Sequence, residues 1–179
     1  MRRTMKTKTT RTTNKSSFRF FLIPITAILL ALVVSNFLVV LAHIPSGSMA
    51  DTIPEGSIVL GSRLAYRGKS PERGDIIFFR HPETGKTLLV KRVIALPGDT
   101  LEIRQGTVYL NGEVLDEPYL SSHGKDDLAP LTVPEGKLIV LGDNREASLD
   151  ARFWEDPFVS LDEVVGKAVL LLFPVIRLL

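Results

Sequence analysis

The chain has 179 residues, which allows one domain or one domain with an appended segment. It contains no cysteine, so disulfides, thiolate metal sites and a cysteine nucleophile are excluded, while the compartment stays open. The net charge of +2 is unevenly distributed, because residues 1–19 hold seven basic residues and no acid, which leaves −5 for the remainder. The basic charge therefore belongs to the N-terminal tail, and we expect no nucleic-acid binding by the folded part.

The N-terminal quarter of the chain, residues 1–42, predicts a membrane anchor. Residues 1–19 are rich in Thr, Ser and Lys, which is typical of a solvated tail that binds anionic lipid weakly. Residues 20–42 carry no charge, and a helix of this length reaches about 34 Å, enough to cross a hydrocarbon core of about 30 Å. We therefore expect a cytoplasmic tail over 1–19, a single transmembrane helix over 20–42 and an extracytoplasmic domain over 43–179 of a cytoplasmic-membrane protein.

A cleaved secretory signal peptide is the alternative for the apolar run, because Ala42 is a small residue at a plausible cleavage point. The apolar core of such peptides is usually about 7–15 residues long, and this run is longer. The length favours an uncleaved anchor.

From Ile53 onwards the sequence predicts a mainly β domain. Short β-branched and aromatic runs alternate with Gly, Pro and Asn, which favours predominantly antiparallel strands with little helix. Residues 100–115 read as a three-stranded meander, with Asn111-Gly112 as a two-residue hairpin turn. Further strands are expected within residues 136–144 and 167–174, and one short helix around 160–165.

The last apolar run, residues 168–179, is about 12 residues long and includes Pro174 and Arg177. It falls short of a membrane span. A buried last strand is favoured, with shallow membrane contact as the alternative.

Two serines and a lysine stand out as candidates for chemistry. Ser46 and Ser48 lie in the segment HIPSGSM, residues 43–49, directly after the apolar run. Lys91 lies within LLVKRVIAL, and in an alternating strand it shares a face with Leu89 and Val93. A lysine there either extends its amine to water or loses its proton, and a neutral amine can take the proton of a serine hydroxyl. The spacing of the residues does not decide between a charged amine that reaches water and a neutral amine that acts as a base.

No metal or cofactor site is expected. The three histidines form no metal-ligand spacing, and the sequence contains no glycine-rich phosphate loop.

Four motifs occur in order after the expected anchor: IPSGSMADTI (44–53), RGDIIFF (73–79), VKRVIALPGD (90–99) and GDNREASLDARFW (142–154). Together they resemble the bacterial type I signal peptidases, or leader peptidases, which are serine proteases with a Ser/Lys dyad. The resemblance is to the compact form with one anchor, and it implies an antiparallel β catalytic domain. It also implies a hydrolase that cleaves signal peptides from exported preproteins without a cofactor. The partners would be preprotein signal peptides and the lipid bilayer, with the oligomeric state left undefined.

Residue by residue, the resemblance implies Ser48 as the nucleophile and Lys91 as its general base. The oxyanion would be held by the Ser46 hydroxyl and the Ser48 backbone N–H. The supporting positions are Ser148, Asp143, Asn144, Arg145, Asp150 and Arg152. The positions expected to bind substrate are Ile44, Pro45, Met49, Ile53, Leu89 and Val90.

The chain departs from the family pattern at a few positions. Ala50-Asp51 follows Met49 where the family commonly has proline, Glu146-Ala147 replaces a frequent Asp-Asn, and Ala151 stands where serine is common. These departures concern supporting contacts and leave the dyad intact.

Three other functions stay open from the sequence. One is a specialised peptidase of the same family that matures conjugation or pilus proteins. Another is a self-cleaving repressor-type Ser/Lys peptidase, which the anchor and the lack of a DNA-binding domain disfavour. The third, from a different class, is a catalytically silent secretion adaptor, against which the presence of Ser48, Lys91 and Ser148 argues.

Overall fold

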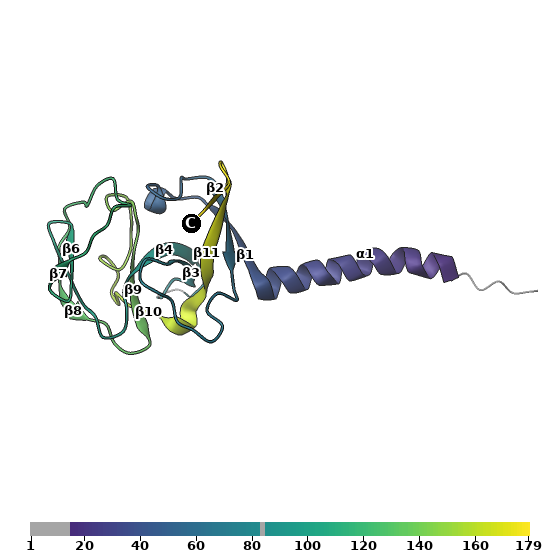
Figure 1. Ribbon diagram of the computed structural model, residues 1–179, viewed down its shortest axis with the longest axis horizontal. Coiled ribbons are helices and arrows are strands. Elements are labelled where there is room, and N and C mark those ends of the chain that lie inside the picture. Colours follow the sequence, from purple (N-terminus) through teal and green to yellow (C-terminus); the bar gives the residue numbers. More distant parts are fainter. Residues whose placement is uncertain (1–14, 83–84) are drawn as a thin grey trace, which may run out of the picture. The chain divides into compact units, whose positions relative to one another are not determined.

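The structure, a computed structural model, describes residues 15–82 and 85–179 (Figure 1). Most of the expected basic tail, residues 1–14, lies outside the described residues. The chain divides into two units, residues 1–34 and 35–179, and each is described by itself.

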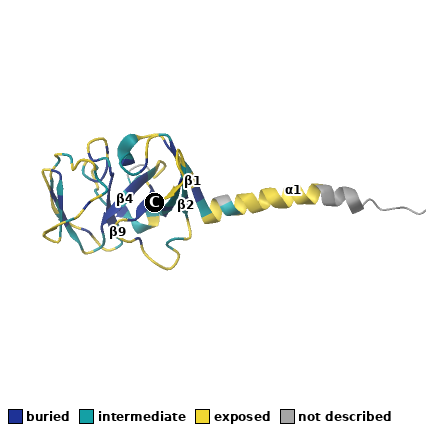
Figure 2. Cartoon of the chain, turned by 45° about the horizontal axis from the view of Figure 1, so that its top comes forward, coloured by how far each residue is buried: buried dark blue, intermediate teal, exposed yellow. Residues whose placement is uncertain are grey.

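The described part of the first unit is the helix α1, Lys15–Val33, which continues into a π-helical turn, Val34–Leu38. The stretch Phe21–Leu38 is long and apolar enough to cross a membrane by length and composition. From Phe21 to Val33 its residues are exposed, as Figure 2 shows. None of these apolar side chains is buried by the described residues.

The expected helix over 20–42 is wrong at its C-terminal end. The strand β1, Val39–Ile44, begins directly after the π-helical turn. Its residues pair in antiparallel register with the strand β2, from Val39 opposite Ser62 to Ile44 opposite Ser57. The β-branched Val40 is only 4% exposed and lies in the core, so packing and sheet hydrogen bonds favour strand here over four more residues of helix.

Two antiparallel sheets make up the second unit, and the expected mainly β fold is confirmed (Figure 1). The larger sheet has the order β1, β2 (Ser57–Ser62), β11 (Val164–Phe173), β3 (Ile76–Arg80), β4 (Leu88–Ala95), β9 (Lys137–Leu141) and β10 (Val159–Ser160), with β12 (Arg177–Leu178) added to β11. The smaller sheet has the order β7 (Glu113–Val114), β6 (Thr107–Leu110), β5 (Thr100–Arg104) and β8 (Leu128–Thr132).

The expected meander is confirmed as β5, β6 and β7. Asn111 and Gly112 both adopt positive φ, 55° and 86°, as a two-residue type I′ turn requires. Gln105 and Gly106, with φ of 48° and 80°, form a second such turn between β5 and β6. The sequence analysis did not identify that turn.

The C-terminal region differs from the expectation in two ways. The strand β11 starts at Val164, earlier than expected, so the short helix shrinks to one 3-10 turn, Leu161–Glu163, with a capping box between Ser160 and Glu163. The β11 strand lies between β2 and β3 within the sheet, as a buried strand should. The residues that follow β11 are not buried, since Val175 is 64% exposed and Leu178 is 82% exposed.

Three apolar clusters form the core, and Figure 2 shows buried residues concentrated in β4 and β9. One cluster joins β1, β2, β3, β4 and β11 to Met49 and Ile53, which are both fully buried. Another lies between the smaller sheet and the ends of β4 and β9. The first cluster therefore fixes the segment that carries Ser48 to the larger sheet.

We predict that Gly61→Ala destabilises the domain. Gly61 is the next-to-last residue of β2, and a Cβ there would be 2.5 Å from the Phe78 ring and 2.9 Å from the backbone oxygen of Lys167. Overpacking of this kind costs about 1–3 kcal/mol of unfolding free energy, to be measured by urea unfolding. Ser62→Ala, one position along the same strand, is the control, and equal stability of the two variants would contradict the prediction.

Candidate active site

Ser48 lies on a short 3-10 turn, Gly47–Met49, just after β1. Pro45 and Gly47 interrupt the strand, and the turn is closed by the Ala50 N–H, which donates to the Gly47 oxygen at 3.0 Å. Met49 points into the core, so Ser48 is left half-buried. The Ser46 Oγ is 3.5 Å from the Ser48 Oγ, so the two hydroxyls lie side by side.

Lys91 is a buried lysine in β4, only 3% exposed. Its Nζ donates to the Ser148 Oγ at 2.8 Å. Burial lowers the pKa of Lys91 to about 8, although the Asp150 carboxylate opposes this by favouring the charged amine. The alternative in which Lys91 extends its amine to water is therefore wrong.

Ser48 and Lys91 line one cavity of about 470 Å³. Its walls are residues 41–46 from β1 and the segment after it, and residues 87–91 at the start of β4. Within the described part of the chain, β1 pairs only with β2, and β9 joins β4 only from Arg92 onwards. The cavity is therefore bordered by two strand edges that still have backbone groups to offer.

The turn after β9 holds the Ser48 segment in place. The Asn144 N–H donates to the Ser48 backbone oxygen at 3.1 Å, and the Asn144 Nδ2 donates to the Gly47 oxygen at 3.0 Å. The Asp143 N–H donates to the Met49 Sδ at 3.3 Å. Asn144 thus acts on the backbone that presents Ser48, and Asp143 on the side chain of the next residue, Met49.

Gly142, which the sequence analysis did not single out, is the close-approach point of the site. A Cβ on Gly142 would lie 2.2 Å from the Ser148 Oγ and 2.5 Å from the Ser48 backbone oxygen. Real Cβ atoms do not approach other atoms so closely. The absence of a side chain at Gly142 is therefore what allows the partner of Lys91 and the segment of Ser48 to meet.

Asp150 and Arg152 form a buried ion pair under Ser148. The Arg152 Nε and Nη2 donate to the two Asp150 oxygens at 2.8 and 3.0 Å, and the Gly142 N–H donates to Asp150 at 2.9 Å. Burial alone would raise the pKa of Asp150, but these hydrogen bonds and the Arg152 charge hold it below its ordinary value. The Arg152 Nη2 also donates to the backbone oxygen of Ser148 at 3.2 Å. This bond holds in place the residue whose hydroxyl accepts the hydrogen bond from Lys91.

Two arginines extend this support, Arg92 to Asp143 and Arg145 to Glu117, and of these two partners only Glu117 lies outside the motifs. The Arg92 side chain donates to both Asp143 oxygens, at 2.8 and 2.6 Å. The Arg145 side chain donates to both Glu117 oxygens, at 3.1 and 2.5 Å, with both side chains almost fully buried. Arg92 could have been found from its place beside Lys91, pointing to the opposite face, whereas Glu117 gives no signal in the sequence.

Four of the six expected substrate-binding residues line the cavity: Ile44, Pro45, Leu89 and Val90. Met49 and Ile53 do not, because both are fully buried in the core cluster. The expectation is wrong for these two residues, because the 3-10 turn directs the Met49 side chain into the core and the Ile53 side chain is buried in the same cluster.

The positions that depart from the family pattern have structural roles. The Asp51 carboxylate accepts a hydrogen bond from the Ser121 N–H at 2.6 Å. Glu146 accepts one from the Ser122 Oγ at 2.7 Å, and Ala151 packs in the core with 1% exposure. Asp51 and Glu146 thus connect the two loops of the site to the same segment, residues 121–122.

Comparison with known proteins places these residues in a family. A family profile described as signal peptidase, peptidase S26, matches residues 17–173. A probable signal peptidase I-2 of Synechocystis is 35% identical over 158 residues, which are 86% of this chain and 72% of that protein. Signal peptidase I of Leptolyngbya laminosa is 36% identical over 85% of this chain and 77% of its own length.

Relatives with the same printed function occur in other bacteria. Signal peptidase I T of Bacillus subtilis is 35% identical over 83% of this chain and 81% of its own length. A crystal structure of a signal peptidase I from Enterococcus faecalis matches with 39% identity and a TM-score of 0.49, covering 55% of this chain and 97% of that one. These matches do not support the specialised maturation peptidase or the silent adaptor. The chain belongs to the signal peptidase family, peptidase S26, a family of serine endopeptidases that cleave signal peptides.

Proposed function

We propose that this chain cleaves signal peptides from exported preproteins with Ser48 as nucleophile and Lys91 as general base. The observation that carries the proposal is that Lys91, a buried lysine with a lowered pKa, lines the same cavity as Ser48. A desolvated amine is neutral in a useful fraction of molecules near pH 8, so it can accept a proton. The hydrogen bond from Lys91 to Ser148 fixes the direction of the amine.

In the proposed reaction the Ser48 Oγ attacks the scissile carbonyl while the Lys91 amine takes the serine proton. The hydrogen bonds of the described residues include none between the Ser48 Oγ and the Lys91 Nζ, and such contacts are often long before substrate binds. The ammonium of Lys91 then protonates the leaving amine, and water hydrolyses the acyl-enzyme. No metal or cofactor takes part.

The oxyanion that forms during attack needs donors that are already in position. We assign them as the Ser48 backbone N–H and the Ser46 hydroxyl, which lies 3.5 Å from the Ser48 Oγ. The bonds from Asn144 to the backbone oxygens of Gly47 and Ser48 support this assignment, because they hold the turn rigid. Rigid donors lose little energy to reorganisation at the moment of reaction.

The substrate would bind as an extended strand between the two free strand edges of the cavity. Strand addition supplies affinity through main-chain hydrogen bonds, and side-chain pockets supply specificity. Ile44 and Val90, each less than 10% exposed, bring branched apolar side chains to opposite walls. Narrow apolar pockets of this kind would select small side chains at positions −1 and −3 of the substrate.

We further propose that α1 and the turn after it anchor the chain in the cytoplasmic membrane, with the basic N-terminus in the cytoplasm and Ser48 outside. Cleavage after Ala42, as in a signal peptide, would remove four of the six residues of β1, Val39–Ile44, and the buried Val40 with them. This favours an uncleaved anchor. The positive charge of residues 1–19 supports the orientation.

The dyad is tested by Ser48→Ala and Lys91→Ala. Each should lower the rate of cleavage of an Ala-x-Ala peptide in detergent about a thousandfold or more, as removal of one member of a catalytic unit does. Ser62→Ala and Lys125→Ala serve as matched controls, and thermal unfolding confirms that the variants fold. Near-normal cleavage by either dyad variant would refute the assignment.

The pH dependence follows from the pKa of Lys91. A general base must be neutral, so kcat/KM should rise tenfold per pH unit below about pH 8 and level off above it. The measurement is a pH profile of peptide cleavage between pH 6 and 10, with wild-type folding checked at each end. A rate that falls between pH 7 and 9, or that keeps rising to pH 10, contradicts the role of Lys91.

Gly142→Ala should lower kcat with little change in KM. The added methyl group must displace either the Ser148 hydroxyl or the Ser48 backbone, and misplacement by about 1 Å costs on the order of a hundredfold in rate. Asn144→Ala, which removes one hydrogen bond from the Gly47 oxygen, should give a smaller loss. An unchanged kcat for Gly142→Ala would contradict the claim that the close approach of Gly142 to Ser148 and to the Ser48 segment positions the dyad.

A further inference from the structure

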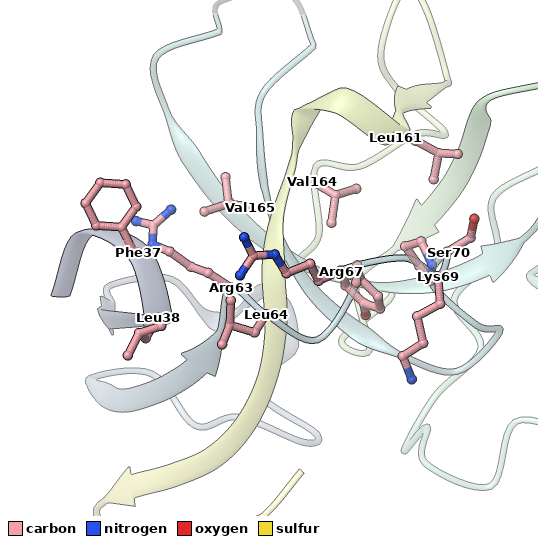
Figure 3. A pocket seen from close by; sticks show the side chains of 12 residues that line it. Phe37, Leu38, Arg63, Leu64, Arg67, Lys69, Ser70, Leu161, Val164 and Val165 are labelled. Atoms are coloured by element: carbon pink, nitrogen blue, oxygen red, sulfur yellow. The ribbon is translucent and has the colours of Figure 1, made fainter. Parts of the chain in front are cut away.

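A second cavity, of about 530 Å³, lies away from Ser48 and Lys91 (Figure 3). It is formed by the connection between β2 and β3, the start of β11, and Phe37 and Leu38 of the π-helical turn. Figure 3 shows Arg63 and Arg67 toward the Phe37 end of this cavity and Lys69 at its other end. It thus combines cationic and apolar side chains.

The charge of this cavity is of one sign. Arg63, Arg67 and Lys69 are among its lining residues, and no carboxylate is. In the described part of the chain the side chains of Arg67 and Lys69 form no ion pair or hydrogen bond, and Arg63 uses its Nε on the Val39 oxygen at 3.1 Å. This is unexpected in a chain whose residues 20–179 carry −5 in total. Three cations without acidic partners indicate an anionic ligand.

The position along the chain indicates where that ligand comes from. Phe37 and Leu38 are the last residues of the stretch that is apolar enough to cross a membrane. The Arg63 N–H donates to the Leu38 oxygen at 2.9 Å, so the cationic loop is tied to that end. If the stretch spans the bilayer, which is part of the proposed function, the cavity lies at the depth of the lipid headgroups.

We propose that this cavity binds an anionic phospholipid of the leaflet from which the catalytic domain emerges. Arg63 and Arg67 would bind the headgroup phosphate, because guanidinium groups match phosphate oxygens with paired hydrogen bonds, and Lys69 at the other end would add to the positive potential of the cavity. The upper part of an acyl chain would pack on the apolar lining residues Phe37, Leu38, Leu64 and Val165. A lipid held there would fix the height of the catalytic domain above the bilayer.

A single-cysteine reporter tests this proposal cleanly, because the chain has no native cysteine. Leu64→Cys, labelled with an environment-sensitive fluorophore in the full chain, is titrated in non-ionic detergent micelles with brominated phosphatidylglycerol or brominated phosphatidylcholine. We expect half-maximal quenching at a concentration of phosphatidylglycerol about tenfold or more below that of phosphatidylcholine. Arg67→Gln with Lys69→Gln should remove this preference.

The matched control is Arg104→Gln with Lys125→Gln, which removes the same charge from exposed positions outside the cavity while leaving the basic tail unchanged. The control should keep the preference for phosphatidylglycerol. Equal quenching by the two lipids, or the same loss in both double variants, would overturn the proposal. Displacement of brominated phosphatidylglycerol by glycerol phosphate at similar concentrations would also overturn it, since the ligand would then be a small anion.

Cleavage of a soluble peptide by the same labelled variants is measured in parallel. Arg67 and Lys69 lie outside the catalytic machinery, so the double variant should keep its peptide cleavage in detergent. Lipid preference in a chain that cleaves nothing would refute the proposed function alone. Cleavage without lipid preference would refute the lipid site alone.

Discussion

The burial of the Lys91 amine is the constraint on which the rest of the site depends. A charged ammonium in an apolar interior is costly, and the cost is what lowers the pKa of Lys91 to about 8. The amine still needs one acceptor, and Ser148 supplies it. Ser148 is itself held through Arg152 and Asp150, whose charges compensate each other. The hydrophobic core thus lowers the pKa of the Lys91 amine, and the ion pair holds the serine that orients it.

Two distant parts of the sequence meet at this nitrogen, and contacts of both the backbone and side chains bring them together. Gly142 lets the turn after β9 approach the Ser48 segment, and Asn144 binds that segment through its oxygens. Arg92, the neighbour of Lys91, binds Asp143 of the same turn. One strand therefore supplies both the proposed base and an anchor for the turn that presents the proposed nucleophile.

Much of this was predictable because the information is local. The apolar run, the alternation around Lys91 and the Asn111-Gly112 turn each predict their structure from adjacent residues, and the ordered motifs indicated the family. What failed depends on tertiary packing. The end of the apolar helix is set by pairing of β1 with β2, and the inward direction of Met49 by a core built from five strands. Glu117 pairs with Arg145 across 28 positions, without any pattern that would announce it.

The two free strand edges beside Ser48 have a consequence for the kind of substrate that could enter. A strand edge offers its N–H and C=O groups only to another backbone in extended form. A segment already folded into a helix or paired in a sheet has no such groups left to give. In the proposed function, the site would therefore respond to the folding state of a passenger protein as much as to its sequence. The bond would be cut only while the chain around it is still unfolded, so exposure of the cleavage segment sets the time available for processing.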